Sequence, residues 1–224
     1  MRYIPSMSSN NDDWSTRHSV LTTARRTAAL INALADDSPD PAEVADVLRA
    51  YGETDPIDLT ARDVAGMRAA AALLRQIFAA EHADDAAATL NRLLQEHTGP
   101  LRLTSHGGST PWHPHLDHDD NAPWDEWLLA SSCMALTVLV WDCQCPPGRI
   151  CASPSCQNVF ITQGSGPERR YCSRRCATRE RVAAHRRSQS AGQQPSGSAR
   201  RSKNDHSEFH DYHSDFAATD HWRR

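Results

Sequence analysis

Apolar residues recur at helical spacing through the first hundred residues of the chain. They are three and four positions apart, as on the buried face of an amphipathic helix. The segments with this pattern are approximately 20–35, 42–51, 64–78 and 85–97. Asp58 or Thr60 can cap the first turn of the third segment, where the spacing is clearest. The pattern predicts four amphipathic helices around a common core.

The pattern changes after residue 100. The short apolar stretches "LRLT" (101–104) and "WHPHL" (112–116) flank the glycine-containing "SHGGST", which predicts a two-stranded hairpin. Pro114 would confine its strand to a sheet edge, because proline cannot donate a ladder hydrogen bond. The next predicted helix, about residues 124–141, is apolar nearly all round and is expected to be buried. We therefore predict a mainly α fold, with a helical domain over residues 18–145.

The two ends of the chain are polar. Residues 1–17 are expected to be flexible, and residues 188–224 contain too few apolar side chains to offset the entropy of ordering. The run "MALTVLVW" (134–141) is far shorter than the ~20 residues of a membrane span. The start of the chain lacks the apolar core of a signal peptide. We expect a cytoplasmic protein without a membrane partner, whose cysteines stay reduced.

Four cysteines form two closely spaced pairs. Cys151 and Cys156 bracket a Ser-Pro-Ser turn, and Cys172 and Cys176 open a predicted helix that Ser173 can cap. The positive end of a helix favours thiolates, and four thiolates predict a closed, tetrahedral site for one structural Zn²⁺. Zinc removal should unfold residues 149–187, whereas the helical domain has apolar residues for a core of its own.

Other assignments of the cysteine-rich segment are weaker. Four separate buried thiols would need a core, and a segment this small and polar has almost none. Cys143 and Cys145 are second choices as ligands because one intervening residue leaves little room for a metal knuckle, and Cys133 is most simply a buried thiol. Between the cysteine pairs, "NVFIT" and "RRY" are predicted to form a hairpin across a glycine-rich turn.

The stretch "CASPSCQNVFITQGSGPERRYCSRRCATRERVAAHRR" resembles the CGNR-type zinc finger, a small treble-clef-like module. In that family the finger usually follows a helical ABATE domain, and the proteins are proposed stress-induced transcription regulators. Upstream, "ALIN", "LNRLL", "LRLT" and "WHPHL" are similar to that domain. The resemblance implies a zinc finger over residues 149–187 with the four ligands named above. It also matches Phe160, Arg170 and Ser173, with Tyr171 where the family usually has tryptophan.

This chain departs from the family pattern in three places. The family's Cys-Gly-Asn-Arg is Cys176-Ala177-Thr178-Arg179 here, and the last two cysteines are one residue closer together. The aspartate that typically follows the phenylalanine is missing after Phe160. Zinc binding should tolerate these changes, whereas any contact made through the Gly-Asn pair is in question.

Charge is distributed unevenly along the chain. Residues 1–148 contain 10 basic and 21 acidic residues, whereas residues 149–187 contain nine arginines and two glutamates. A zinc ion together with four thiolates carries a formal charge of −2, which does not require so many cations. Sign asymmetry of this kind suggests a polyanionic partner for the basic segment. The side chains expected to contact DNA are Arg169, Arg170, Arg174, Arg175, Arg179, Arg181, His185 and Arg186.

DNA-binding transcription regulation is therefore the function expected, with RNA binding as a variant. The main alternative is a protein-interaction finger without nucleic-acid binding. The simplest explanation of the basic helix is that it is solvated and only aids solubility. The resemblance further implies a small-molecule effector for the helical domain, contacted by Trp112 and His113. The sequence specifies neither the effector nor the DNA target nor the oligomeric state.

Histidine-rich stretches raise a second metal hypothesis. His113, His115, Asp117 and His118 could form a catalytic centre, but no H-E-x-x-H helix or similar partner accompanies them. His206, His210 and His213 could bind metal from a tail that is expected to be disordered. No phosphate loop, catalytic triad or acid–base carboxylate pair is evident, so the chain is not expected to be an enzyme.

Overall fold

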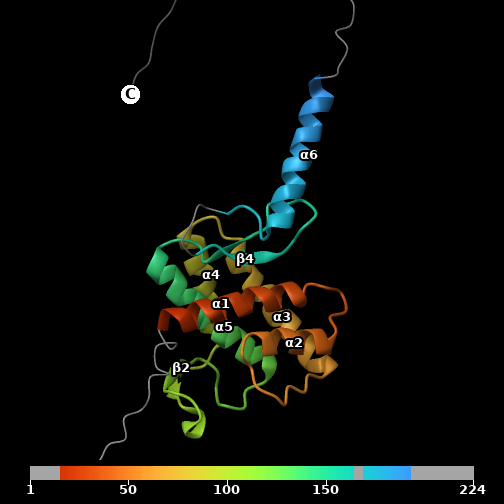
Figure 1. Ribbon diagram of the computed structural model, residues 1–224. Helices are drawn as coiled ribbons and strands as arrows, with labels where there is room; N and C mark the ends of the chain where they lie inside the picture. The colour runs from red at the N-terminus through yellow and green to blue at the C-terminus, as the bar shows by residue number, and fades with distance from the viewer. Residues whose placement is uncertain (1–15, 164–168, 193–224) are drawn as a thin grey trace, which may run out of the picture. The chain divides into compact units, whose positions relative to one another are not determined.

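The computed structural model describes residues 16–163 and 169–192 (Figure 1). The chain divides into two compact units, Met1–Ala184 and His185–Arg224. Its first helix begins at Thr16, and the last helix of the described chain ends at Gly192. The remainder of both predicted flexible ends, 1–15 and 193–224, lies outside the described residues.

Five helices form the N-terminal part, as predicted from four segments with helical apolar spacing and one that is apolar nearly all round. They are α1 (Thr16–Ala33), α2 (Pro41–Ala50), α3 (Ala61–Phe78), α4 (Ala83–His97) and α5 (Trp124–Cys143). Thr60, and not Asp58, caps α3: its hydroxyl accepts from the Asp63 backbone N–H at 3.2 Å. The Asp63 carboxylate accepts from the Thr60 N–H at 2.9 Å, which completes a capping box. The predicted mainly α fold is confirmed.

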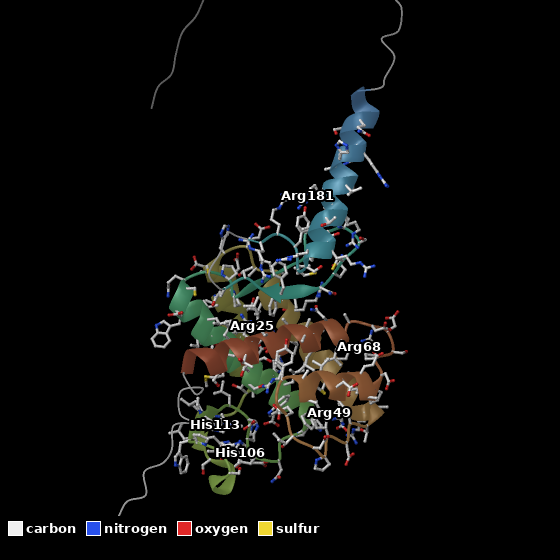
Figure 2. The ribbon with its side chains drawn as sticks, in the orientation of Figure 1. Arg25, Arg49, Arg68, His106, His113 and Arg181 are labelled. Atoms are coloured by element: carbon white, nitrogen blue, oxygen red, sulfur yellow. The ribbon has the colours of Figure 1, made fainter. Side chains whose placement is uncertain are left out.

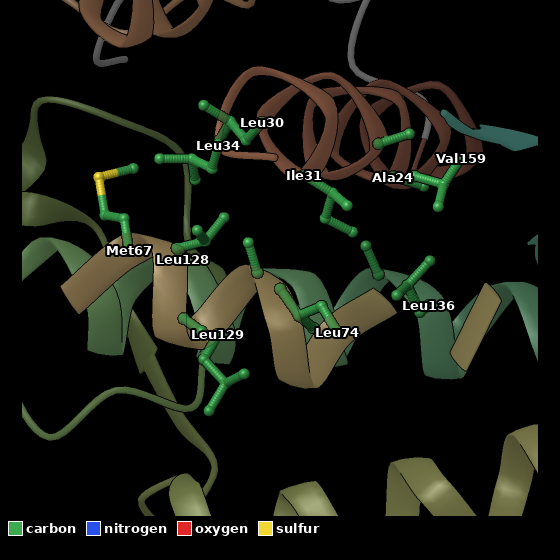
Figure 3. Packing of buried hydrophobic residues seen from close by; sticks show 14 of the residues in the cluster. Ala24, Leu30, Ile31, Leu34, Met67, Leu74, Leu128, Leu129, Leu136 and Val159 are labelled. Atoms are coloured by element: carbon green, nitrogen blue, oxygen red, sulfur yellow. The ribbon is translucent and has the colours of Figure 1, made fainter. Parts of the chain in front are cut away.

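Helix α5 is the centre of the core. It packs against α1, α3 and α4, which explains why its sequence is apolar on nearly every side. Figure 3 shows Leu128 and Leu136 of α5 facing side chains of α1 and α3, and both leucines are fully buried. By length and composition α5 could also cross a membrane. Its position among three other helices makes it the core helix of this domain.

The predicted hairpin after residue 100 is present as a small antiparallel sheet. Strand β1 (Arg102–Thr104) pairs with β2 (His113–His115), and Pro114 lies opposite Leu103. The turn contains a short 3-10 helix, η2 (His106–Gly108). The sheet has two strands, so Pro114 lies on an edge, where a missing N–H is tolerated.

The zinc-finger segment contains a different hairpin from the predicted one. Strand β4 (Val159–Ile161) pairs with β3 (Gly148–Ile150), which precedes the first cysteine, and not with "RRY". The turn between Cys151 and Cys156 reverses the chain and brings the preceding strand beside the following one. Helix α6 (Arg174–Gly192) begins between the two members of the second cysteine pair, after Cys172 and before Cys176.

The finger hairpin is part of the helical core. Val159 and Ile161 are 1% and 5% exposed and belong to the same apolar cluster as the side chains of α1, α3 and α5. The Asn32 side chain of α1 pairs with the Val159 backbone, accepting from its N–H at 2.8 Å and donating to its carbonyl at 3.0 Å. The two parts thus share a core, where the sequence suggested separate ones.

Candidate metal centre and basic cleft

Four cysteines meet at the junction of the β3–β4 hairpin and α6. The sulfurs of Cys151, Cys156, Cys172 and Cys176 all lie within 4.8 Å of one another. The Cys172 sulfur is 3.7 Å from those of both Cys156 and Cys176. A tetrahedron with Zn–S bonds of about 2.3 Å has sulfur–sulfur edges of about 3.8 Å. The donor set and its spacing therefore fit one structural zinc ion.

Backbone hydrogen bonds hold the first cysteine pair in a knuckle. The Cys156 N–H donates to the Ser153 carbonyl at 2.9 Å, and the Cys151 N–H donates to the Asn158 carbonyl at 2.8 Å. The Ala152 N–H donates to the Arg170 carbonyl at 2.9 Å, tying the knuckle to the segment that leads into Cys172. Short-range turns and one long-range bond thus bring the two pairs together.

The second pair lies at the start of α6, and Ser173 caps that helix as predicted. Its hydroxyl accepts from the Cys176 N–H at 3.3 Å, and its carbonyl accepts from the Ala177 N–H. A side-chain hydrogen bond between the Ser173 hydroxyl and the Cys176 thiol lowers the pKa of that thiol to about 7. Burial raises the pKa of the Cys172 thiol to about 12. Zinc must bind both as thiolates, so zinc binding releases protons.

A Ser173→Ala variant should therefore bind zinc less tightly at neutral pH. Without the hydroxyl, the pKa of Cys176 moves up toward its ordinary value, and more of the thiol must be deprotonated by the metal. We expect zinc affinity at pH 7 to fall by a factor on the order of ten and the loss to shrink as the pH rises. Competition with a chromophoric chelator between pH 6 and about 9 measures this, with the exposed Ser155→Ala as control. A pH-independent loss would contradict the proposed cause.

Three further side chains connect the knuckle to α6, and sequence reasoning missed two of them. Ser153 is 1% exposed and donates to a Glu180 carboxylate oxygen at 2.5 Å. A guanidinium N–H of Arg179 donates to the Ser153 hydroxyl at 2.8 Å and to the Cys176 sulfur at 3.5 Å. Arg179 therefore offsets part of the thiolate charge. A serine in a turn and a glutamate in a basic helix carry no distinguishing sequence signal.

A cleft of about 550 Å³ lies beside this centre. Four arginines line it: Arg25 from α1, Arg169 from the segment before the second cysteine pair, and Arg175 and Arg179 from α6. No carboxylate is among the described residues that line it. Arg25 was not expected, because it lies far from the basic segment in sequence. The shared core brings α1 beside the finger.

The other expected arginines differ in their contacts. Arg169 donates to the Ile161 carbonyl at 2.9 Å and lies over the Phe160 ring, and Arg170 lies near the Tyr171 ring. Arg174 and Arg181 are exposed and form no ion pair with the described part of the chain. Figure 2 labels Arg25 and Arg181, which come from α1 and α6. His185 and Arg186 belong to the second unit.

The remaining sequence candidates are not members of the cysteine cluster. Trp112 is 72% exposed, and the His113 ring is 4.8 Å from that of His115 between centroids. His118 lies apart from them and pairs with Glu126 at 2.6 Å. Cys133 is buried, which raises its pKa to about 12, and Cys143 and Cys145 are not among the clustered cysteines. The tail histidines 206, 210 and 213 lie outside the described residues.

Four clustered cysteines beside a basic helix define a zinc-finger protein. Comparison with protein families assigns residues 148–189 to the CGNR zinc finger. Residues 16–142 match the ABATE family, described as "Putative stress-induced transcription regulator". This match spans more than half of the chain, and the chain belongs to that family. A search of curated proteins finds no match.

The family assignment confirms the predicted architecture and the single structural zinc. The protein is accordingly a zinc-binding regulator, assembled from an ABATE domain and a CGNR finger. Neither family is an enzyme family.

Proposed function

We propose that this protein is a DNA-binding transcription regulator whose arginine-lined cleft holds the phosphate backbone. The cleft is the observation that carries the proposal, because it gathers four guanidinium groups without a carboxylate among its described lining residues. Guanidinium groups pair with phosphate oxygens through paired N–H donors. This positive charge contrasts with the net negative charge of residues 1–148.

Electrostatics within the finger do not require all of these cations. Arg179 already donates to a zinc-ligand sulfur. Arg174 and Arg175 lie in the first turn of α6, where the helix dipole disfavours positive charge. Their placement is favourable when a more negative partner lies in front of the helix, and a DNA backbone supplies such a partner.

The proposed contacts differ in how freely each side chain can reach DNA. Arg25 and Arg175 line the cleft, are exposed and form no ion pair with described residues, so they are the principal phosphate contacts. Arg169 and Arg179 also line the cleft, but hydrogen bonds within the finger restrain them. Arg170, Arg174 and Arg181 extend the basic surface around it. His185 and Arg186 are in the second unit and are left out of this surface.

The ABATE domain senses an effector and changes how the finger meets DNA through their shared core. The protein acts in the cytoplasm at the chromosome, without catalysis.

Salt dependence of DNA binding tests the proposal. About four phosphate contacts imply a slope near −4 for log K against log salt concentration, at about −0.9 per contact. An Arg25→Ala/Arg175→Ala double variant should flatten the slope by about two units and weaken binding to all duplex sequences alike. Fluorescence anisotropy of the zinc-loaded full chain with a labelled duplex, over a series of salt concentrations, measures both quantities.

Arg68→Ala is the matched control. Arg68 is an exposed arginine of α3 that pairs with Asp37 and lies outside the cleft, so its loss should leave the slope unchanged. Binding that is absent at low salt, or a slope that the double variant does not alter, would favour a protein-interaction finger. Selective binding to single-stranded RNA would favour the RNA variant.

A further inference from the structure

Three histidines meet at the β1–β2 hairpin, far in sequence from the zinc finger. One ring nitrogen each of His106, His113 and His115 lies within 4.8 Å of the others. Figure 2 shows His106 and His113 side by side at this hairpin. His106 comes from the turn, and the other two come from β2. No residue of the zinc centre or of the basic cleft takes part.

Hydrogen bonds determine which ring nitrogens carry the protons. The His113 Nδ1 is 2.8 Å from the Pro111 carbonyl oxygen, and the His115 Nδ1 is 2.9 Å from both Asp117 carboxylate oxygens. A carbonyl and an ionised carboxylate can only accept, so each Nδ1 must donate. In the neutral rings, each Nε2 therefore presents a lone pair.

These two lone pairs face each other. The Nε2 atoms of His113 and His115 are 2.9 Å apart, with no hydrogen left to share between two neutral rings of these tautomers. Such an arrangement is repulsive unless a cation or an additional proton lies between the nitrogens. The third imidazole, that of His106, increases the number of nitrogen donors at the same point and favours a metal cation over a single proton.

Charged residues behind the histidines orient them. Asp117 is 3% exposed, bonds His115, and accepts from the Arg102 guanidinium at 2.5 Å. Arg102 also donates to Asp120 at 2.6 Å, and Asp120 lies 3.6 Å from the Nδ1 of His106. Carboxylates behind metal-ligating histidines fix the ring orientation and raise the basicity of the ligating nitrogen. His115 thus has a carboxylate partner in Asp117, and His106 lies near a second carboxylate, that of Asp120.

The backbone of the turn is unusual at His106. Its φ is 47°, in the left-handed region that a residue with a side chain rarely adopts, and Gly107 and Gly108 follow at 67° and 91°. The His106 N–H donates to the Thr104 hydroxyl at 3.1 Å, which helps to hold this conformation. The result is that the His106 ring lies 5.1 Å from His113 and 5.0 Å from His115, centroid to centroid.

We propose that His106, His113 and His115 bind a late first-row divalent metal ion such as Zn²⁺, with a fourth position open to solvent. Three imidazoles without a thiolate suit zinc, copper or nickel. Nitrogens of a tetrahedral zinc site lie about 3.3 Å apart, so His113 and His115 need to separate by only a few tenths of an ångström. All three histidines are partly exposed, and the ion exchanges with solvent.

The proposal deepens the sensing role of the ABATE domain, and it rests on the proposed function in that respect only. It assigns the effector to a chemical class, a divalent metal ion, at the hairpin where Trp112 and His113 were expected to contact a ligand. Strand β2 also contacts α5, the core helix that packs on α1. Metal binding itself is measured without DNA, so its failure is separate from failure of DNA binding.

Cadmium-113 NMR of the full chain distinguishes the two kinds of site, because thiolate and imidazole ligands give well-separated resonances. We expect two ions per chain, one at the cysteines and one at the histidines. His113→Ala and His106→Asn should each remove only the second resonance and weaken the corresponding Zn²⁺ affinity by more than about a hundredfold. Changes to residues that only orient a metal ligand typically cost ~10–100-fold. Asparagine is chosen because it tolerates the left-handed backbone at residue 106.

His118→Ala is the matched control, since His118 is 70% exposed and outside the cluster. It should keep both resonances, and so should a variant with His206, His210 and His213 replaced by alanine. Far-UV circular dichroism checks that each variant is folded. A single ion per chain, or a second ion that survives both cluster variants or disappears with the tail histidines, would overturn the proposal. In that case the His113–His115 pair is held by a shared proton.

Discussion

A Cys172→Ser variant is expected to lose its zinc and to unfold the helical core together with the finger. The Cys172 sulfur has two ligand sulfurs at 3.7 Å, so its replacement opens the tetrahedron. Metal binding contributes roughly 10–16 kcal/mol to the folding of small zinc-finger peptides, as much as the whole stability of an ordinary domain. Without it the β3–β4 hairpin loses its anchor, and Val159 and Ile161 leave the core.

The measurement combines metal content with thermal unfolding followed by helical circular dichroism. Wild-type protein should contain zinc at the cysteine site and melt in one transition, and the variant should melt at a much lower temperature or be unfolded at 25 °C. Cys143→Ser is the control, because Cys143 is exposed and is not among the clustered cysteines. If zinc were lost while the helical transition stayed at the wild-type temperature, the finger and the helices would be independent after all.

A Gly148→Ala substitution should destabilise the same junction without touching a zinc ligand. A Cβ at this position would lie 2.4 Å from the Phe160 carbonyl oxygen and 2.6 Å from the Phe78 ring. Both neighbours are fixed, one as strand backbone and the other as a buried aromatic ring. Overpacking of this kind costs about 1–3 kcal/mol, and we expect the upper end, a fall in Tm of roughly 6–12 °C.

Gly66→Ala provides the comparison, because Gly66 is inside α3 and the nearest neighbour of its added methyl would be the exposed Asp125 side chain, at 3.1 Å. The side chain can move, and alanine gains up to about 1 kcal/mol of helix propensity over glycine. Gly66→Ala should therefore melt within a few degrees of wild type. Equal melting temperatures for the two variants would show that close packing at Gly148 does not limit stability.

Local sequence patterns were sufficient for the helices and for the zinc ligands. Apolar spacing located α1 to α4 because each buries one stripe, and α5 was recognised because it is apolar on nearly every side. Thr60 marked the start of α3 because a cap acts within one turn. The four zinc ligands were evident from the sequence because they form two closely spaced cysteine pairs. Such short spacing lets each pair bind one ion through a local turn, whatever the rest of the chain does. The strand partner of β4 was predicted wrongly as "RRY", whereas β4 pairs with β3. Both segments are compatible with a strand, and the pattern of apolar residues does not specify which of them pairs with β4.

What the sequence determined by itself is therefore the set of local elements, the family and the metal donors of the finger. Only the tertiary structure decided that the finger shares a core with the helices, that Arg25 joins the basic cleft, and that His106 meets His113 and His115. Each of these depends on contacts between residues that no local propensity relates. Asn32 and Val159, for example, are 127 positions apart and pair because the core brings α1 beside β4.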